Sequence, residues 1–372
     1  MLRAVLADVI HFATSKREAE DRMTELADLT NTYGGLVVVR AIQRKAKPDY
    51  GTFLGKGKVQ ELIDTWPEHK ANVLVVNEIL KPGQLYNLEE ALRPVKMKVW
   101  DRIDLILQIF DKHATTAEAK LQIELARLRH MGPRIYNMGA ELGRQRGGTG
   151  TRGGAGEGNT ESMKRHLKEQ ERRILDKLKA YERQHTEQRK FRSRQKFKTV
   201  ALVGYTNAGK TSLLNALTKR VEYAADKLFA TLDTRIGELY LPEVQTSVLL
   251  SDTIGFIQGL PPELIQAFRS TLSEAVHADL ILHVIDATDP HLELKLKVVE
   301  EILGELKLAD RPRLRVFNKL DKLVTPPAHD PESAYVSAHA KLGLAELRSL
   351  IARRLFPDGF VVPTSEKKLG DF

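Results

Sequence analysis

Residues 199–220 read TVALVGYTNAGKTSLLNALTKR, an apolar run followed by a loop with two glycines and a segment of helix-forming residues. The loop from Gly204 to Thr211 matches the pattern GxxxxGK[ST]. That pattern binds phosphate where a strand precedes it and a helix follows, because the backbone amides at the helix start then converge on the anion. Both neighbours are present here. The stretch therefore predicts a phosphate-binding loop within an α/β domain.

The positions of this loop have distinct expected roles. The backbone amides of Asn207 to Lys210 are expected to surround the phosphates, and the Lys210 ammonium to neutralise charge between the β- and γ-phosphates. The Thr211 hydroxyl is expected to bind Mg²⁺. The nucleotide-binding residues predicted from this region are Gly204, Asn207, Ala208, Gly209, Lys210, Thr211, Ser212 and Phe229.

Two further segments are expected to respond to the γ-phosphate. One of them, the second switch, is DxxG, with Asp252 and Gly255 after the apolar run SVLL. Asp252 is predicted to orient a water bound to Mg²⁺, and the Gly255 amide to detect the γ-phosphate and release when it is lost. The other, the first switch, lies earlier in the chain and reads LFATLDTRIGELYL, where Thr231 is preferred to Thr234 as the residue that reaches Mg²⁺ and the γ-phosphate. The predicted catalytic residues are Lys210, Thr231 and Gly255, and the predicted metal ligands are Thr211, Thr231 and, through water, Asp252.

A fourth segment is expected to recognise the base. Asn318, Lys319 and Asp321 form NKxD after the apolar run RLRVF. The Asp321 carboxylate can accept hydrogen bonds from guanine N1 and the exocyclic amine, whereas adenine has no matching pair of donors. A site built around this acceptor rejects the wrong base by ~10³-fold or more, since the acceptor would stay unpaired. Ser337 and Ala338 are expected to complete the pocket with a backbone amide to guanine O6. GTP and GDP are therefore the expected ligands.

These motifs fall at the ends of regularly placed apolar runs. The runs are TVALVG, SVLLSD, LILHVID, RLRVFNK and SAYVSA. In a doubly wound sheet, ligands bind outside the carboxyl ends of the parallel strands. We therefore predict that residues 198–372 form a P-loop GTPase domain with a doubly wound sheet and a short C-terminal tail.

Residues 1–112 alternate short apolar runs with helix-like stretches, which predicts an N-terminal parallel α/β domain. Within it, GTFLGKGKVQEL places Gly55, Lys56, Gly57 and Lys58 at an expected helix start. Two interpretations stay open. The amides and lysines could hold an anion, or the glycines could form a tight turn with exposed lysines.

Residues 113–197 are predicted to form a long antiparallel helical hairpin with a basic linker at its end. Leu121, Leu125 and Leu128 recur at helical spacing, and a second apolar stripe follows in residues 163–181. Two helices that each carry a single stripe are expected to bury these stripes against each other.

The connection between the two helices, residues 139–158, reads GAELGRQRGGTGTRGGAGEG and has nine glycines in twenty positions. One interpretation is a flexible linker. The interpretation we favour is a segment that orders on RNA, because glycine lets the backbone approach a surface and arginine meets phosphates. The basic stretch that follows Tyr181, with Phe191 and Phe197, is either a linker or a further RNA contact. The candidate RNA contacts are Arg144, Arg146 and Arg152.

The basic residues are concentrated in this central part of the chain. Residues 127–198 hold 20 Lys and Arg against 8 Asp and Glu, a net charge of +12 that leaves −3 for the rest of the total of +9. Such a surplus predicts an anionic partner, with nucleic acid first. The alternative is a solvated, lysine-rich helix.

The composition also excludes several classes of protein. None of the 372 residues is cysteine, which excludes disulfides, thiolate metal sites and a cysteine nucleophile. No apolar run approaches the roughly 18 to 20 residues that a membrane span needs, and the first twelve residues do not resemble a signal peptide. We therefore expect a cytoplasmic protein without a membrane span.

Taken together, these motifs resemble those of the HflX-type GTPases, which are ribosome-associated members of the translation-factor class of P-loop GTPases. The stretches that carry the resemblance are GTFLGKGKVQEL, AKLQIELARLRHMGPRI, GGTGTRGG, GYTNAGKTSLLNALT, LFATLDTR, SDTIGFIQGLPPELIQAFRSTL and NKLDK. The resemblance implies a Mg²⁺-dependent GTPase with Thr211 and Thr231 as magnesium ligands. It also implies that the glycine-rich tip reaches into the large (50S) ribosomal subunit near its catalytic centre, and that the chain splits or rescues stalled ribosomes during stress.

Two stretches depart from the family pattern. The family usually has Asp-Pro-Thr-Thr-Arg after FATL, where this chain has Asp233, Thr234 and Arg235. The family's glycine-rich loop commonly continues as Gly-Pro-Gly-Glu-Thr, where this chain reads GGAGEGNTE. These differences concern the first switch and the RNA contacts rather than the nucleotide site.

Phe256 follows the DxxG motif directly, at a place where many related switches have a glutamine that orients the attacking water. A phenyl ring cannot position water. One hypothesis is that Phe256 points away and that a partner completes the site. The other, compatible with the first, is that Phe256 is a core residue beneath the second switch.

Three functions can be built from these elements. The expected one is a monomeric, ribosome-stimulated GTPase that binds the 50S subunit and its rRNA. The alternatives are an accessory GTPase for processing or modification of non-ribosomal RNA, and an ATP-assisted RNA remodeller that uses the N-terminal domain as a second nucleotide site.

Overall fold

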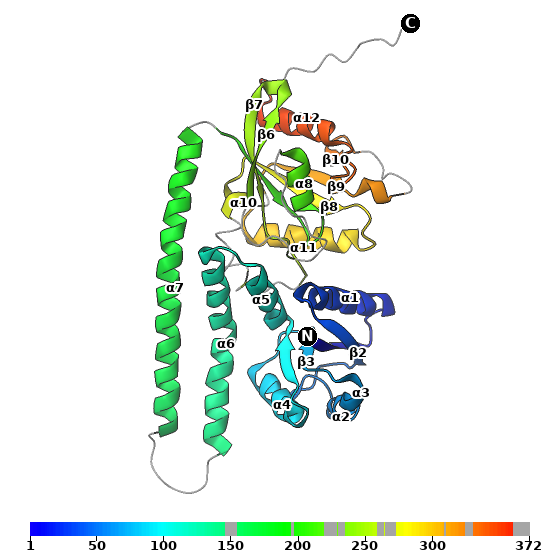
Figure 1. Cartoon of the computed structure of the whole chain (residues 1–372), viewed down its shortest axis with the longest axis vertical. Coiled ribbons are helices and arrows are strands. Elements are labelled where there is room, and N and C mark those ends of the chain that lie inside the picture. Colours follow the sequence, from blue (N-terminus) through cyan, green and yellow to red (C-terminus); the bar gives the residue numbers. More distant parts are fainter. Residues whose placement is uncertain are drawn as a thin grey trace, which may run out of the picture. The chain divides into compact units, whose positions relative to one another are not determined.

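The computed structural model of this chain describes residues 1–145, 155–194, 197–218, 229, 235–258, 264, 273–308, 310–323 and 330–359 (Figure 1). It contains two compact units, of which the first takes in Met1–Tyr181 and the second begins at Glu182. The division into three domains at residues 112 and 197 stays a prediction. No helix within the described ranges is long and apolar enough to cross a membrane.

The first unit is built on a four-stranded parallel sheet with the order β2-β1-β3-β4. In the centre, Val5 of β1 lies opposite Val39 of β2 and Leu74 of β3. The side chains of β1 and β3 are buried almost throughout, as expected for strands covered on both faces. The predicted N-terminal parallel α/β fold is confirmed. The strands are β1 (Arg3–Ile10), β2 (Leu36–Arg44), β3 (Val73–Val76) and β4 (Lys98–Asp101).

Local signals explain where the helices of this unit begin and end. The Ser15 hydroxyl accepts the Glu18 amide at 3.1 Å and starts the first helix, which Gly34 ends with φ of 93°. The helices are α1 (Lys16–Tyr33), α2 (Lys56–Asp64), α3 (Trp66–His69), α4 (Pro82–Leu92) and α5 (Arg102–His113), with the 3-10 turn η1 (Arg93–Val95).

The glycine-lysine stretch lies at the start of α2, as expected. The Gly55 amide donates to Gln43 Oε1 at 2.8 Å, and Lys58 pairs with Glu61 at 2.7 Å. These two bonds fit the tight turn, and the anion site at Lys56 and Gly57 stays a prediction.

The hairpin consists of α6 (Ala117–Gln145) and α7 (Ala155–Arg194), which lie side by side and run in opposite directions in Figure 1. Arg129 on α6 donates to Glu171 on α7 at 2.8 Å. The predicted hairpin is confirmed. Both helices extend into the predicted loop 139–158, because each added helical residue gains a hydrogen bond that offsets the roughly 1 kcal/mol penalty of a glycine.

The apolar surface of α6 is wider than the sequence stripe predicted. Leu125 is buried, but so are Ala119, Ile123 and Ala126, which the prediction did not include. This helix contacts α4 and α5, so part of its apolar surface is covered by the first unit's own α/β fold. The described part of α6 therefore also packs against α4 and α5, which the sequence stripe did not predict. Of the predicted α7 stripe, Ile174 is buried, whereas Met163 is exposed and Leu167, Leu178 and Tyr181 are half-buried.

The second unit is built on a six-stranded sheet with the order β10-β9-β8-β5-β7-β6. All pairs are parallel except β6 with β7. The predicted doubly wound sheet is confirmed. The strands are β5 (Thr199–Val203), β6 (Arg235–Leu241), β7 (Thr246–Asp252), β8 (Leu280–Asp286), β9 (Arg313–Asn318) and β10 (Ser333–Tyr335).

The edge strand β6 was not predicted. It has buried Leu239 and Leu241 alternating with exposed Glu238 and Tyr240, a pattern visible in the sequence. The helices that cover this sheet are α8 (Lys210–Leu217), α10 (Ser273–His277), α11 (Leu292–Glu305) and α12 (Leu344–Leu355), with 3-10 turns η2 (Pro242–Val244) and η3 (Leu320–Lys322).

Four charged side chains join α6 to the start of α5 in the first unit. Asp101 caps α5 and is fully buried, with Asp104 one turn further on. His130 Nε2 lies 3.1 Å from Asp101 Oδ1 and 3.4 Å from Asp104 Oδ1. Arg134 donates to both oxygens of Asp104, at 2.9 and 3.1 Å, and also to Asp101. Two cations on successive turns near the middle of α6 therefore hold this helix against two carboxylates at the start of α5.

The ion pairs shift the pKa of His130. Burial alone would lower this pKa, but the hydrogen bonds to Asp101 and Asp104 outweigh burial and raise it to about 9. For Asp104, burial is likewise opposed by bonds from His130 and by Arg134, and the pKa falls to about 2. His130 and Asp104 are thus both charged near neutral pH.

The charged state of His130 predicts a pH-dependent stability. Because its folded pKa of about 9 lies above the ordinary 6.5, its contribution is complete below pH 6.5 and is lost as pH rises through 9. Wild type should lose roughly 3 kcal/mol of unfolding free energy from this group, and His130→Gln should lack this component. Urea unfolding followed by tryptophan fluorescence measures it, since both tryptophans, Trp66 and Trp100, lie in the first unit. The same pH dependence in both proteins would show that folded His130 is neutral.

Candidate guanine-nucleotide site

The predicted motifs of the second unit meet at one edge of its sheet. Gly204 follows β5, while Asp252 ends β7 and Asn318 ends β9. These strands are parallel to one another or to a shared neighbour, so their carboxyl ends lie on the same side. This is the edge at which doubly wound folds bind their ligands.

Two glycines of the loop are required by its close packing. Gly204 has φ of 153°, and a Cβ atom there would lie 2.2 Å from the Val284 carbonyl oxygen. Gly209 has φ of 90°, and a Cβ atom there would lie 2.2 Å from Asn318 Nδ2. No other residue fits either position without moving β8 or the Asn318 side chain.

Lys210 begins α8 and folds back over the loop. Its Nζ donates to the carbonyl oxygens of Gly204 at 3.1 Å and Tyr205 at 2.9 Å. Burial lowers the pKa of Lys210 to about 8, against the opposing effect of Asp252. The ammonium thus occupies the mouth of the loop, where an incoming phosphate would offer it stronger, charged acceptors.

The two predicted metal ligands that the structure describes lie next to each other. Thr211 Oγ1 donates to Asp252 Oδ2 at 2.7 Å. A hydroxyl and a carboxylate are hard oxygen donors of the kind that Mg²⁺ binds. Ser212 follows on the same turn of α8, while Thr231 lies outside the described residues.

The second switch is joined directly to the phosphate loop. The Phe256 amide donates to the Gly204 carbonyl at 3.1 Å, and the Thr206 amide donates to the Phe256 carbonyl at 2.8 Å. These bonds form a parallel bridge between Tyr205 and Phe256. A Cβ atom on Gly255 would come within 2.8 Å of Thr206 Cα. Phe256 itself is 1% exposed, so the core-residue hypothesis is confirmed.

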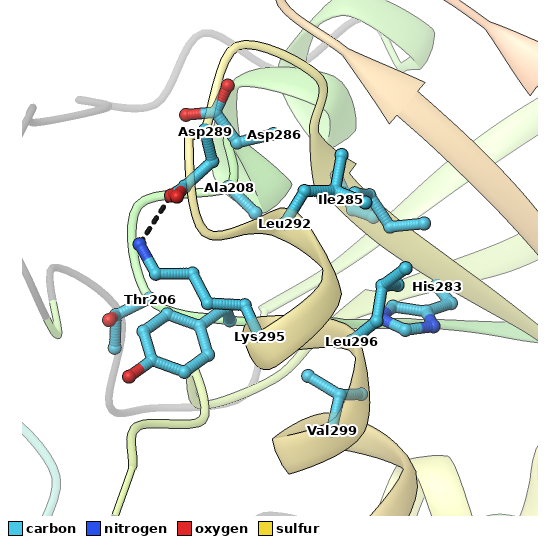
Figure 2. A pocket seen from close by; sticks show the side chains of 12 residues that line it. Thr206, Ala208, His283, Ile285, Asp286, Asp289, Leu292, Lys295, Leu296 and Val299 are labelled. Atoms are coloured by element: carbon cyan, nitrogen blue, oxygen red, sulfur yellow. Dashed lines mark hydrogen bonds and ion pairs between the residues drawn. The ribbon is translucent and has the colours of Figure 1, made fainter. Parts of the chain in front are cut away.

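Tyr205 reinforces this junction and also lines a small cavity of about 20 Å³, shown in Figure 2. The Tyr205 hydroxyl accepts a hydrogen bond from the backbone N–H of Gln258, with 2.8 Å between nitrogen and oxygen. On the other side, Lys295 of α11 lies 4.9 Å from the Tyr205 ring centroid and pairs with Asp289. Tyr205 therefore connects the phosphate loop to the second switch and to α11.

Asn318 connects the phosphate loop to the base-recognition loop. Its Nδ2 donates to the Ala208 carbonyl at 2.9 Å, and its Oδ1 accepts the Ala338 amide at 3.0 Å. The side chain is buried, so neither contact competes with bulk water. Asn318 thus sets the spacing between the two halves of the site.

The remaining base-pocket residues form a second set of contacts. The buried Ser337 hydroxyl donates to Asp321, and this bond lowers the pKa of the exposed Asp321 carboxyl. The ionised form of Asp321 is therefore favoured, which its predicted role as an acceptor for guanine requires. Lys319 Nζ lies 2.7 Å from Asp286 Oδ2, which fixes its side chain beside the pocket.

The structure locates most of the other predicted residues. Asn207 has φ of 61° in the phosphate loop, and Phe229 is 2% exposed. Arg144 lies in the last turn of α6, with only its backbone described. Arg146 and Arg152 lie outside the described residues.

Sequence reasoning missed several residues that shape the site. Thr206 and Tyr205 occupy variable positions of GxxxxGK[ST], so the motif gave them no role. Asp286 ends the run LILHVID, a signal that was available but unused. Lys295 could not be found, because only the fold brings α11 to the loop.

Comparison with known proteins identifies the family. Family models match three successive segments: "GTP-binding GTPase N-terminal" over residues 20–111, "GTP-binding GTPase Middle Region" over 113–192 and "50S ribosome-binding GTPase" over 199–319. GTPase HflX of Caldanaerobacter subterraneus subsp. tengcongensis is 42% identical, covering 97% of this chain and 82% of that protein. GTPase HflX of Escherichia coli K12 is 37% identical, covering 95% and 83%.

The chain belongs to the HflX family of GTPases. Among solved structures, it is similar to SsGBP in complex with GDP, at 27% identity and a TM-score of 0.50 over 95% of this chain and 98% of that one. The predicted GTPase activity and binding of guanine nucleotide are confirmed by this membership. The roles of the individual HflX site residues stay predictions.

Asn318 and Asp321 provide a paired test of the base pocket. Asn318→Ala leaves two buried backbone groups without partners, so it should lower the unfolding free energy by about 2 to 5 kcal/mol and weaken GDP binding. Asp321→Ala changes an exposed side chain, so stability should stay within about 0.5 kcal/mol. Its GDP affinity should nevertheless fall about 100-fold, as expected for lost bonds to a charged acceptor. Thermal unfolding and fluorescent-GDP titration measure both. Wild-type GDP affinity in Asp321→Ala would rule out base contact by this carboxylate.

Proposed function

We propose that this HflX-family GTPase is a GTP-controlled switch that binds the large ribosomal subunit and contacts its rRNA through the basic hairpin. In the cytoplasm it acts as a monomer and splits or rescues stalled ribosomes under stress. The observation that carries the proposal is the direct bridge between Phe256 and the phosphate loop. Through this bridge, the position of the second switch depends on whether the phosphate loop binds GTP or GDP.

The bridge and the γ-phosphate compete for the same groups. The Gly204 carbonyl accepts from both the Phe256 amide and Lys210 Nζ. A bound γ-phosphate draws the Lys210 ammonium toward itself and the Gly255 amide with it. Since Gly255 packs directly on Thr206, this movement opens the bridge. GTP therefore favours a conformation of the second switch that GDP does not, which is the requirement for a population shift.

Mg²⁺ fits the oxygen donors of this site. Thr211 would hold the ion directly and Asp252 through water, with Thr231 as the further ligand predicted from the sequence. The ion would supply charge neutralisation for the β- and γ-phosphates.

Two observations support the large ribosomal subunit as partner. The family model that covers residues 199–319 describes 50S ribosome-binding GTPases. The hairpin region, residues 127–198, carries a net +12 and presents much of that charge to solvent. Exposed cations on α7 are Arg165, Lys168, Arg172, Arg173, Lys177, Lys179, Arg183 and Lys190. A long positively charged helix of this kind suits rRNA phosphates.

The buried Phe256 ring supports activation by the partner. It cannot orient the attacking water from inside the core. Free enzyme is therefore expected to hydrolyse GTP slowly, and completion of a site by a partner can raise turnover by several powers of ten.

Co-sedimentation and turnover with purified 50S subunits test the proposal. The chain should pellet with 50S in the presence of a non-hydrolysable GTP analogue, and at least tenfold less should pellet with GDP. GTP turnover should rise at least 100-fold on addition of 50S. Equal binding in both nucleotides together with a fast, unaffected basal rate would contradict the proposal. Binding to other RNA but not to 50S would favour the accessory-GTPase alternative, and ATP binding that survives loss of Lys210 would favour the remodeller.

The same assay isolates the hairpin tip. Replacing Arg144, Arg146 and Arg152 by alanine should weaken 50S binding and reduce the slope of log K against log salt by about 2 to 3, one phosphate contact for each arginine. The matched control replaces Lys297, Lys307 and Arg311, exposed cations of the second unit, and changes net charge equally. Equal effects of the two triple variants would show that the tip makes no specific RNA contact.

A further inference from the structure

The Thr206 hydroxyl is a buried polar group without a role in the fold. Thr206 is 6% exposed, and its Oγ1 is inaccessible to solvent and has no hydrogen-bond partner within the described chain. Its backbone amide, by contrast, is bound to the Phe256 carbonyl. A buried hydroxyl without a partner destabilises the folded state, so its presence calls for an explanation such as a catalytic role or a bound water.

The position of Thr206 favours the catalytic explanation. The point at which a Gly255 Cβ would stand lies 2.8 Å from Thr206 Cγ2 and 3.0 Å from Lys210 Nζ. The Thr206 methyl group therefore borders the same small space as the two groups expected to meet the γ-phosphate, and the hydroxyl branches from the same Cβ atom. Figure 2 shows Thr206 at the edge of the cavity, on the opposite side from Leu292 and Leu296 of α11.

A bound water is the competing explanation. The adjacent cavity of about 20 Å³ has room for one water, and Thr206 is among the residues that line it. A water there would satisfy the hydroxyl in every nucleotide state. The catalytic explanation therefore predicts that the hydroxyl affects GTP hydrolysis but not GDP binding. The bound-water explanation predicts no dependence on the nucleotide.

We infer that the Thr206 hydroxyl is a catalytic group that donates a hydrogen bond to a γ-phosphoryl oxygen of bound GTP. The inference rests on the proposed nucleotide site and adds a residue to it. When the bridge to Phe256 opens, the Thr206 amide is released on the same side. One residue then presents two donors to the γ-phosphoryl group, and GDP has no atom there to receive them.

The reaction itself needs no proton from Thr206. The oxygen of a water attacks the γ-phosphorus, and the bond from that phosphorus to the β–γ bridging oxygen breaks. GDP leaves with the electron pair, and the water's protons are distributed between inorganic phosphate and solvent. Negative charge spreads over the γ-phosphoryl oxygens in the transition state. A preformed donor at one of them stabilises that charge, which the buried Phe256 ring cannot do.

The test compares Thr206→Val, which keeps the shape and removes the hydroxyl, with Thr206→Ser, which keeps the hydroxyl. Single-turnover GTP hydrolysis should be about 100-fold slower in Thr206→Val, the usual effect of losing one such donor. Thr206→Ser should stay within threefold of wild type. GDP affinity should change less than twofold in both. The thermal midpoint of Thr206→Val should equal or exceed that of wild type, because an unpaired buried hydroxyl has been removed.

Each other outcome has a definite meaning. A Thr206→Val rate within threefold of wild type would overturn the inference and favour the bound water. Parallel loss of GDP affinity and stability in Thr206→Val would overturn it too, by showing a structural role. Failure of the wild-type chain to bind GDP or hydrolyse GTP would instead remove the proposed nucleotide site.

Discussion

The carbonyl oxygen of Gly204 is the atom on which the rest of the site depends. It accepts hydrogen bonds from the Phe256 amide and from Lys210 Nζ, each at 3.1 Å. The phosphate loop, the first residue of its helix and the second switch therefore meet at one acceptor. Only glycine fits there, since a Cβ atom would collide with the Val284 carbonyl. In the proposed switch, a γ-phosphate attracts the Lys210 ammonium away from this carbonyl, and a change of one phosphate thereby alters the position of a backbone segment.

In the first unit, too, donors from one segment converge on acceptors of another, here through four charged side chains. His130 and Arg134 lie on one face of α6, and Asp101 and Asp104 receive them at the start of α5. A buried charge that loses its partner destabilises the fold by about 3 to 5 kcal/mol, so the middle of α6 has little freedom to tilt. The helix whose last turn carries Arg144 is thus fixed to the start of α5.

Sequence reasoning succeeded where function is encoded locally. The phosphate loop, Asp252 and Asp321 each lie at a strand end whose polar residues follow an apolar run, so spacing alone located them. It failed where contacts between parts of the chain that are distant in sequence determine the structure. The second apolar face of α6 is defined by α4 and α5, and the His130 ion pair joins residues 29 apart in sequence. The Thr206 hydroxyl could not be predicted to lack a partner, because a threonine in a loop normally finds one and only the packed structure shows that this one has none among the described residues.

Amide hydrogen exchange at Phe256 tests the central claim most directly. The Phe256 amide donates to the Gly204 carbonyl in the structure, so it should be protected in the free chain and with GDP. With Mg²⁺ and a non-hydrolysable GTP analogue it should exchange at least tenfold faster, because the γ-phosphate opens the bridge. Equal protection in all three states would show that the second switch does not respond to the γ-phosphate through this contact.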